Sequence, residues 1–199
     1  MLNLVNSNAP ALAGTINLLG HSVVLVDSYT QLSGISHLII PGNGSIAGVI
    51  SEIDLDDSLR PALIDYISSG RHLLGICLGM QLLGINSEES ADSKCLGTFS
   101  LCIEAMARNS GNLRVPHVGW NQVFHNSSSP IFENIPSGSD FYFSHSFAVV
   151  DKSFSIASTE YGFTFSSSIN TGNVYGVQFH PESSQFVGGQ LLNNFLALR

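Results

Sequence analysis

Charged side chains are scarce in this sequence: Asp, Glu, Lys and Arg make up 11% of its 199 residues. Soluble domains typically carry about 25%. Only 7 Lys and Arg stand against 15 Asp and Glu, so the formal net charge is −8. Such a chain lacks the basic surface with which proteins bind nucleic acids or anionic membranes, and we expect neither as a partner.

Cysteine is also scarce, and long apolar runs are absent. The three cysteines, Cys77, Cys95 and Cys102, are an odd number without metal-like spacing, which fits a reducing compartment better than a disulfide framework. Residues 1–20 lack the positive n-region and long apolar core of a secretory signal. No apolar run reaches the length of a transmembrane helix. We therefore expect a cytoplasmic protein.

The hydrophobic fraction is 44%, enough for a sizeable core, and the length favours one domain over residues 1–199. Apolar residues at helical spacing predict helices over 9–19, 58–69 and 188–198. Apolar or β-branched runs predict strands over 2–5, 22–26, 37–40 and 73–76, and, in the β-rich second half, over 99–105, 121–124, 141–150, 153–157 and 174–179. Apolar strands alternating with helices indicate a parallel sheet covered on both faces. We predict a single-domain α/β fold, a flavodoxin-like mixed sheet with a largely parallel core flanked by helices.

Residues 72–84 join a buried strand to a helix through a cysteine. The run 73–76 is apolar, and the Leu and Met residues after Cys77 fall at helical spacing. A cysteine between Gly75 and Gly79 at such a joint matches the nucleophile elbow, with Cys in place of the more familiar Ser. The glycines leave room for a sharp turn, and the helix N-terminus would stabilise a thiolate. The alternative is a cysteine packed in the core at a glycine-rich strand end.

A cysteine nucleophile needs a base and a group that orients the base. Of seven histidines, four are expected to be structural or exposed: His21, His37, His72 and His125. Among the others, His117, His145 and His180, the last fits best, because the strand 174–179 ends at His180 and the following proline keeps it extended. Side chains two residues apart on an extended segment point the same way, so Glu182 can accept the other ring N–H of His180.

An acyl-transfer intermediate also needs two N–H donors for its oxyanion. The amide of Leu78 can supply one. The glycine-rich segment 41–45 follows the strand 37–40, which places it at the same sheet edge as Cys77. Its backbone can supply the second donor. An ordinary strand-exit turn is the alternative for this segment.

Three segments together resemble the class I, triad-type glutamine amidotransferases: Pro41-Gly42-Asn43-Gly44-Ser45, Gly75-Ile76-Cys77-Leu78-Gly79-Met80-Gln81 and Val177-Gln178-Phe179-His180-Pro181-Glu182. Their order and spacing match over nearly the whole chain. Met80 and the runs 116–121 and 142–146 are similar to the glutaminase subunit of imidazole glycerol phosphate synthase. The resemblance implies that L-glutamine is hydrolysed to glutamate and ammonia through a thioester on Cys77, with His180 protonating the leaving ammonia and Glu182 completing the triad.

The resemblance also implies roles for other residues. The oxyanion hole would be formed by backbone amides of Asn43, Gly44 and Leu78. The amino-acid end of glutamine would be held by Gln81, Glu89, Ser146 and Phe147. The interface with a (β/α)8 synthase subunit, which receives the ammonia in a heterodimer, would lie near Asn8, His117, Trp120 and Asn121. No metal or organic cofactor is implied.

The chain departs from the family pattern at three places expected to face the partner. The family start resembles Asp-Tyr-Gly-x-Gly-Asn, but residues 3–8 read Asn-Leu-Val-Asn-Ser-Asn, so only Asn8 survives. Ser90 stands where a glycine is usual, and Ser183 where a lysine is usual. We infer that the glutaminase chemistry is kept and that the partner or its coupling is altered.

Four hypotheses follow. The chain delivers ammonia to imidazole glycerol phosphate synthesis in histidine biosynthesis, or it is a paralogue that serves amidation of a bacterial surface-polysaccharide sugar precursor. A non-enzymatic binding protein on this fold is the third, and the intact Cys77, His180 and Glu182 argue against it. A cysteine hydrolase acting on other amides is the fourth, and Gln81 and Glu89 argue against it because they suit an amino-acid substrate.

Overall fold

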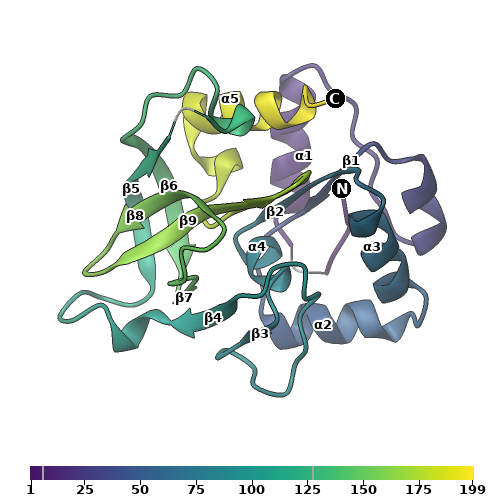
Figure 1. Cartoon of the computed structure of the whole chain (residues 1–199). Coiled ribbons are helices and arrows are strands. Elements are labelled where there is room, and N and C mark those ends of the chain that lie inside the picture. Colours follow the sequence, from purple (N-terminus) through teal and green to yellow (C-terminus); the bar gives the residue numbers. More distant parts are fainter. Residues whose placement is uncertain (6, 127) are drawn as a thin grey trace.

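The computed structural model describes residues 1–5, 7–126 and 128–199. They form a seven-stranded sheet in the order β1-β2-β10-β9-β8-β5-β6 and a three-stranded sheet in the order β3-β4-β7 (Figure 1). The strands of the large sheet are β1 (His37–Ile40), β2 (His72–Ile76), β5 (His117–His125), β6 (Ser139–His145), β8 (Ser155–Glu160), β9 (Thr164–Thr171) and β10 (Val174–Val177). Those of the small sheet are β3 (Asn86–Ser87), β4 (Cys102–Ala105) and β7 (Phe147–Ala148). In the large sheet β1, β2 and β10 run parallel, and the other neighbours are antiparallel.

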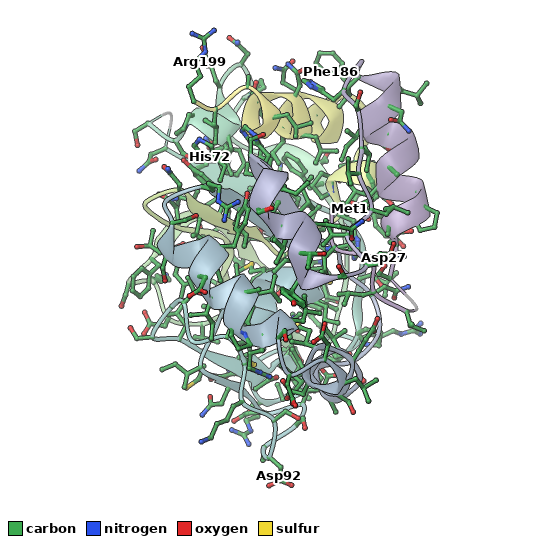
Figure 2. The ribbon with its side chains drawn as sticks, turned by 90° about the vertical axis from the view of Figure 1, so that its right-hand side faces the viewer. Met1, Asp27, His72, Asp92, Phe186 and Arg199 are labelled. Atoms are coloured by element: carbon green, nitrogen blue, oxygen red, sulfur yellow. The ribbon has the colours of Figure 1, made fainter. Side chains whose placement is uncertain are left out.

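Helices cover both faces of the parallel strands (Figure 1). The α-helices are α1 (Ala9–Leu18), α2 (Ile46–Leu55), α3 (Leu59–Ser68), α4 (Leu78–Leu82) and α5 (Gln185–Leu196), and short 3-10 helices are η1 (Tyr29–Gly34), η2 (Met106–Arg108), η3 (Pro130–Phe132) and η4 (Pro181–Ser183). Helices α1 and α5 lie side by side on one face, and α2, α3 and α4 lie on the other. Figure 2 shows Asp92, in the loop between β3 and β4, at one end of the molecule, with Phe186 and Arg199 at the opposite end. In the described part of the chain, no helix is both long and apolar enough to cross a membrane.

Alternate residues of the parallel strands feed two separate cores. Leu38, Ile40 and Leu73 pack on the side of α2 and α3, whereas Leu74 and Ile76 pack on the side of α1 and α5. All five are fully buried. Because successive strand residues point to opposite faces, a continuous apolar run is what a sheet covered on both sides requires. The predicted α/β fold class, a mixed sheet flanked by helices, is therefore confirmed.

The strand predicted over 22–26 is wrong. In the described chain its pairing is limited to an isolated parallel bridge between Val26 and Leu2, and the strand predicted over 2–5 is reduced to the same bridge. The chain start lies between this run and β1, since the Leu2 N–H donates to the Ile39 carbonyl at 2.9 Å. Most of the run 22–26 therefore lies outside the sheet, and Val24 is 52% exposed.

Helix α2 and strand β9 were missing from the sequence-based prediction. Ser45 begins α2, because its hydroxyl accepts the Gly48 N–H at 3.2 Å, and the buried residues of α2 have helical spacing. Strand β9 contains three consecutive serines that are fully buried, Ser166, Ser167 and Ser168. Their polarity hides the strand from a search for apolar runs, whereas the signal for α2 was present and overlooked.

Candidate active site

The backbone at Cys77 is strained and held in place by close packing. Cys77 lies between β2 and α4 with φ 50° and ψ −106°, a conformation that residues with side chains rarely adopt. Its N–H donates to the Val177 carbonyl at 2.7 Å, which ties the turn to β10. A Cβ on Gly79 would lie 2.9 Å from the Ile40 carbonyl carbon, and one on Gly75 would lie 2.5 Å from the Gly79 oxygen. The glycines therefore allow α4 to pack directly against the sheet.

His180 and Glu182 come from the end of β10 and lie beside Cys77. The backbone N–H of His180 donates to the Tyr142 carbonyl at 2.8 Å. The ring Nδ1 of His180 lies 2.8 Å from Glu182 Oε1. The two side chains are 10% and 2% exposed. A Cβ on Gly42 would lie 2.9 Å from Cys77 Cβ and 3.3 Å from His180 Cε1, so the sulfur-bearing residue and the ring border the same gap.

Electrostatics favour a charged His180. Burial lowers the pKa of His180, but hydrogen bonds and charges from Cys77 and Glu182 outweigh it and raise this pKa to about 10. Burial raises the pKa of Glu182, yet hydrogen bonds from His180 and Asn8 and the charge of His180 leave it lowered. Asn8 Nδ2 donates to Glu182 Oε1 at 2.6 Å. A protonated imidazole beside a cysteine favours the thiolate, so the arrangement suits an ion pair ready for nucleophilic attack.

A cavity of about 440 Å³ opens over Cys77 and His180. Its volume lies in the range of small-molecule sites, which is about 300–1,000 Å³. Its lining contains every residue assigned by resemblance to the oxyanion hole or to glutamine, and Asn8 as well: Asn8, Asn43, Gly44, Leu78, Gln81, Glu89, Ser146 and Phe147. The structure therefore brings eight of the expected residues to one place, drawn from both halves of the chain.

The polar groups of this cavity have defined orientations. Asn43 and Gly44 have φ values of 96° and 92°, so two successive peptides turn sharply beside Leu78. Glu89 Oε2 accepts the Ile46 N–H at 3.3 Å at the start of α2. Burial raises the pKa of Glu89, and this hydrogen bond opposes the rise. A carboxylate in such a place can receive a ligand ammonium group.

Gln81 is oriented by a backbone carbonyl. Gln81 Nε2 lies 3.0 Å from the Phe147 oxygen and 3.1 Å from Gln178 Oε1, and its side chain is buried. A carbonyl oxygen can only accept, so the amide nitrogen must face it. The Gln81 oxygen is then the acceptor that remains for a ligand.

The predicted interface residues of β5 do not line this cavity. His117 is 3% exposed, whereas Trp120 is 48% exposed on the other face of the strand. Asn121 Nδ2 donates to the Glu160 carbonyl at 2.9 Å and lies 3.3 Å from His117 Nε2. Their role at an interface stays a prediction. Trp120 is accessible to a partner, whereas His117 is buried and could contribute only by supporting the strand from inside.

His117 and His145 form a buried neutral pair. Burial lowers the pKa of His117 to about 4, and burial with the nearby His117 and His180 lowers that of His145 to about 3. His145 Nδ1 lies 2.9 Å from the Phe147 oxygen and therefore donates to it, so its Nε2 accepts from His117 Nδ1 at 3.0 Å. His117 Nε2 then accepts from Asn121, and every ring nitrogen has a partner.

One residue beside the sulfur was missing from the predicted site. Gln178 is fully buried, and its Nε2 lies 3.6 Å from Cys77 Sγ. Two signals pointed to it: it is the polar residue of the apolar run 174–179, and it lies two positions before His180 on an extended segment.

The three departures from the family pattern lie in different surroundings. Ser183 lines the cavity, so the altered position is next to the site itself. Ser90 instead shares a 2.7 Å hydrogen bond with Ser93 in the loop after β3. At the chain start, Asn3 Nδ2 donates to Asp27 Oδ1 at 2.6 Å, and Asn6 lies outside the described residues. Within the described ranges, no cluster of three or more His, Cys, Asp or Glu side chains could hold a metal ion.

The fold and the site together have the arrangement of an α/β enzyme that uses a cysteine for acyl transfer, with a cavity in the size range of small-molecule sites. The family model of class-I glutamine amidotransferases matches residues 4–198. Imidazole glycerol phosphate synthase subunit HisH of Thermococcus kodakarensis is 39% identical over 204 residues, covering 100% of both chains. The same subunit of Photobacterium profundum is 37% identical over 199 residues, covering 96% of this chain and 93% of the relative. The chain therefore belongs to the class-I glutamine amidotransferases and, within them, to the family of HisH subunits.

Solved structures agree on the fold. A crystal structure of a glutamine amidotransferase has a TM-score of 0.74 at 17% identity, covering 98% of this chain and 96% of the other. PurLQS from Thermotoga maritima has a TM-score of 0.73 at 16% identity, covering 98% and 95%. At these identities the likeness shows the fold alone.

Proposed function

We propose that this chain is the glutaminase subunit of imidazole glycerol phosphate synthase and supplies ammonia for histidine biosynthesis. The observation that supports this most is the Cys77–His180–Glu182 cluster at a cavity of about 440 Å³, in a chain similar to HisH subunits along nearly its whole length. Residues 1–199 act as one amidotransferase domain in the cytoplasm.

The reaction begins at the sulfur. The Cys77 thiolate attacks the side-chain amide carbon of L-glutamine, and the negative charge moves to the carbonyl oxygen. Backbone amides of Leu78 and of the Asn43–Gly44 loop stabilise this oxyanion; one such donor is typically worth roughly 3–4 kcal/mol of barrier. His180 protonates the nitrogen, ammonia leaves, and a thioester remains. The now neutral His180 takes a proton from water, which attacks the thioester, so that glutamate leaves and the thiolate returns.

Glutamine is oriented by its amino-acid end. The Glu89 carboxylate and the Gln81 oxygen accept from the α-ammonium group, and the backbone around Ser146 and Phe147 borders the same end of the cavity. This arrangement selects an amino acid over a simple amide, because a substrate without the ammonium group would leave Glu89 unpaired. No cofactor takes part in these steps.

Ammonia passes to a cyclase partner of the (β/α)8 type in a heterodimer. We assign the interface to the region of Asn8, His117, Trp120 and Asn121. The outer face of β5 supports this choice, since Val118 and Trp120 are 56% and 48% exposed. An aromatic side chain presented in this way is a common anchor of protein interfaces.

The test is glutamate release from glutamine in the presence of the cyclase partner. Cys77→Ala is expected to abolish release while keeping the thermal midpoint close to that of the wild type. Cys102→Ala, the matched control at an exposed free cysteine, is expected to leave release unchanged. Glutamate release by Cys77→Ala would refute the mechanism. The pathway is tested separately: the wild type with its partner should restore growth of a histidine auxotroph that lacks its own glutaminase subunit, and failure would refute that assignment.

A further inference from the structure

Gln178 stands between the nucleophile and the residue expected to bind glutamine. Its side chain is 0% exposed. Nε2 lies 3.6 Å from Cys77 Sγ, and Oε1 accepts from Gln81 Nε2 at 3.1 Å. Its backbone N–H donates to the Ser167 carbonyl at 2.9 Å, which fixes the main chain beside β9.

The orientation of the Gln178 amide follows from a chain of contacts that starts at the backbone. The Phe147 carbonyl requires an N–H from Gln81, and the second N–H of that same nitrogen points to Gln178. Gln178 must present its oxygen there, so its nitrogen faces the sulfur. The opposite orientation would set two NH₂ groups against each other and an oxygen against Cys77.

The second polar group near the sulfur, the Ser144 carbonyl, can accept a hydrogen bond but cannot donate one. The Ser144 carbonyl lies 3.8 Å from Cys77 Sγ and can only accept, so it suits the protonated thiol. Gln178 can only donate to the sulfur, so it suits the thiolate. A buried anion without donors is strongly disfavoured, and hydrogen bonds to charged groups gain strength where water is excluded.

We propose that Gln178 is a further catalytic residue, which stabilises the Cys77 thiolate through an N–H···S hydrogen bond and is oriented for this by Gln81. The thiolate occurs twice in the reaction, as the attacking group and as the group released when water cleaves the thioester. Because the thioester sulfur carries no charge, the hydrogen bond is weaker in that intermediate and favours release of the thiolate. The inference rests on the proposed glutaminase function, and it adds a contact between substrate recognition and the nucleophile.

The experiment measures the rate of Cys77 alkylation by iodoacetamide against pH, which reports the thiolate without requiring glutamine. Gln178→Leu removes the donor at similar size and is expected to move the midpoint upward by about one pH unit, a tenfold loss of thiolate below the midpoint. Gln178→Glu keeps an acceptor for Gln81 but places a carboxylate against the sulfur, and its midpoint should move further upward. The matched control is Ser168→Ala, because Ser168 is equally buried and its hydroxyl donates to the Gly176 carbonyl at 2.8 Å. Its midpoint should stay that of the wild type.

Turnover supplies the second measurement. With glutamine and the partner present, Gln178→Leu is expected to lower kcat about tenfold with a smaller change in KM. If both folded Gln178 variants share the alkylation profile of Ser168→Ala, the inference is refuted and Gln178 is only a packing residue. If the wild type releases no glutamate, the proposed function fails, and the alkylation profiles still decide the role of Gln178.

Discussion

Replacement of Asn8 by alanine is expected to lower glutaminase turnover even in the absence of a partner subunit. Asn8 Nδ2 donates to Glu182 Oε1 at 2.6 Å, and the same oxygen lies 2.8 Å from His180 Nδ1. The Glu182 side chain is 2% exposed, so water cannot readily replace the lost donor. Hydrogen bonds to charged groups contribute about 1.5–3 kcal/mol, which corresponds to roughly ten- to a hundredfold in kcat if the whole contribution acts in the transition state.

The physical reason is the position of the carboxylate. Without Asn8, the pKa of Glu182 loses one of the hydrogen bonds that lower it, and the carboxylate is less firmly held against the ring of His180. Asn8→Asp should be more harmful than Asn8→Ala, because it adds a second negative charge beside Glu182. Asn3→Ala is the matched control: its amide donates to Asp27 at the exposed surface, where one contact contributes little.

The assay is glutamate release by the isolated subunit and by the complex, together with the Kd for the cyclase partner. A lower kcat in both preparations is the expected outcome for Asn8→Ala, and the Kd measures separately whether Asn8 also contributes to the interface. If Asn8→Ala leaves turnover of the isolated subunit unchanged, the positioning argument is wrong, and an effect confined to the complex would leave Asn8 with its proposed interface role alone.

Three further predictions concern packing, pH and substrate binding. Gly79→Ala should lower the free energy of unfolding by about 1–3 kcal/mol or more, because its Cβ would overlap the backbone of β1. Gly14→Ala, at an exposed position of α1 where a Cβ meets no other atom, should raise it by about 0.5–1 kcal/mol, and equal effects in urea denaturation would contradict the packing argument. The unfolded chain protonates His117 and His145 near pH 6.5 while their folded pKa values are about 4 and 3, so the free energy of unfolding should fall as pH drops from 6.5 to 5, and a flat profile counts against the buried neutral pair. Glu89→Gln should raise KM for glutamine about tenfold with kcat nearly unchanged; a fall in kcat alone would show that Glu89 does not bind the substrate.

Local sequence patterns were sufficient to predict Cys77 as the nucleophile and His180 as its base. The strand, the flanking glycines and the helix around Cys77 lie within about a dozen residues, and the geometry of an extended His-Pro-Glu segment depends on the backbone alone. The strands predicted over 37–40 and 73–76 were equally accessible, because burial on both faces requires an unbroken apolar run. Each of these features can be worked out without knowing what packs against it.

Contacts between distant segments were beyond sequence reasoning. Asn8 and Glu182 are 174 positions apart, and nothing near either residue signals their hydrogen bond. The run 22–26 has the composition of a strand, but the chain start takes the place beside β1. Two of the buried serines of β9 donate to carbonyls of other segments, Ser166 to Asp151 and Ser168 to Gly176, both at 2.8 Å. In each case the deciding partner comes from elsewhere in the chain.

Strand β5 connects the proposed partner surface to the glutamine cavity through the Phe147 carbonyl. Its outer face carries exposed Trp120, while on its inner face His117 donates to His145, which donates to the Phe147 oxygen. The same oxygen accepts from Gln81, which in turn sets the orientation of Gln178 at the sulfur. These hydrogen-bond directions are mutually consistent only if both histidines are neutral, and burial lowers the pKa of His117 to about 4 and that of His145 to about 3. The Phe147 carbonyl has two lone pairs and accepts both hydrogen bonds at once, so this single oxygen is the point at which the histidine pair of the β5 side meets the Gln81 amide.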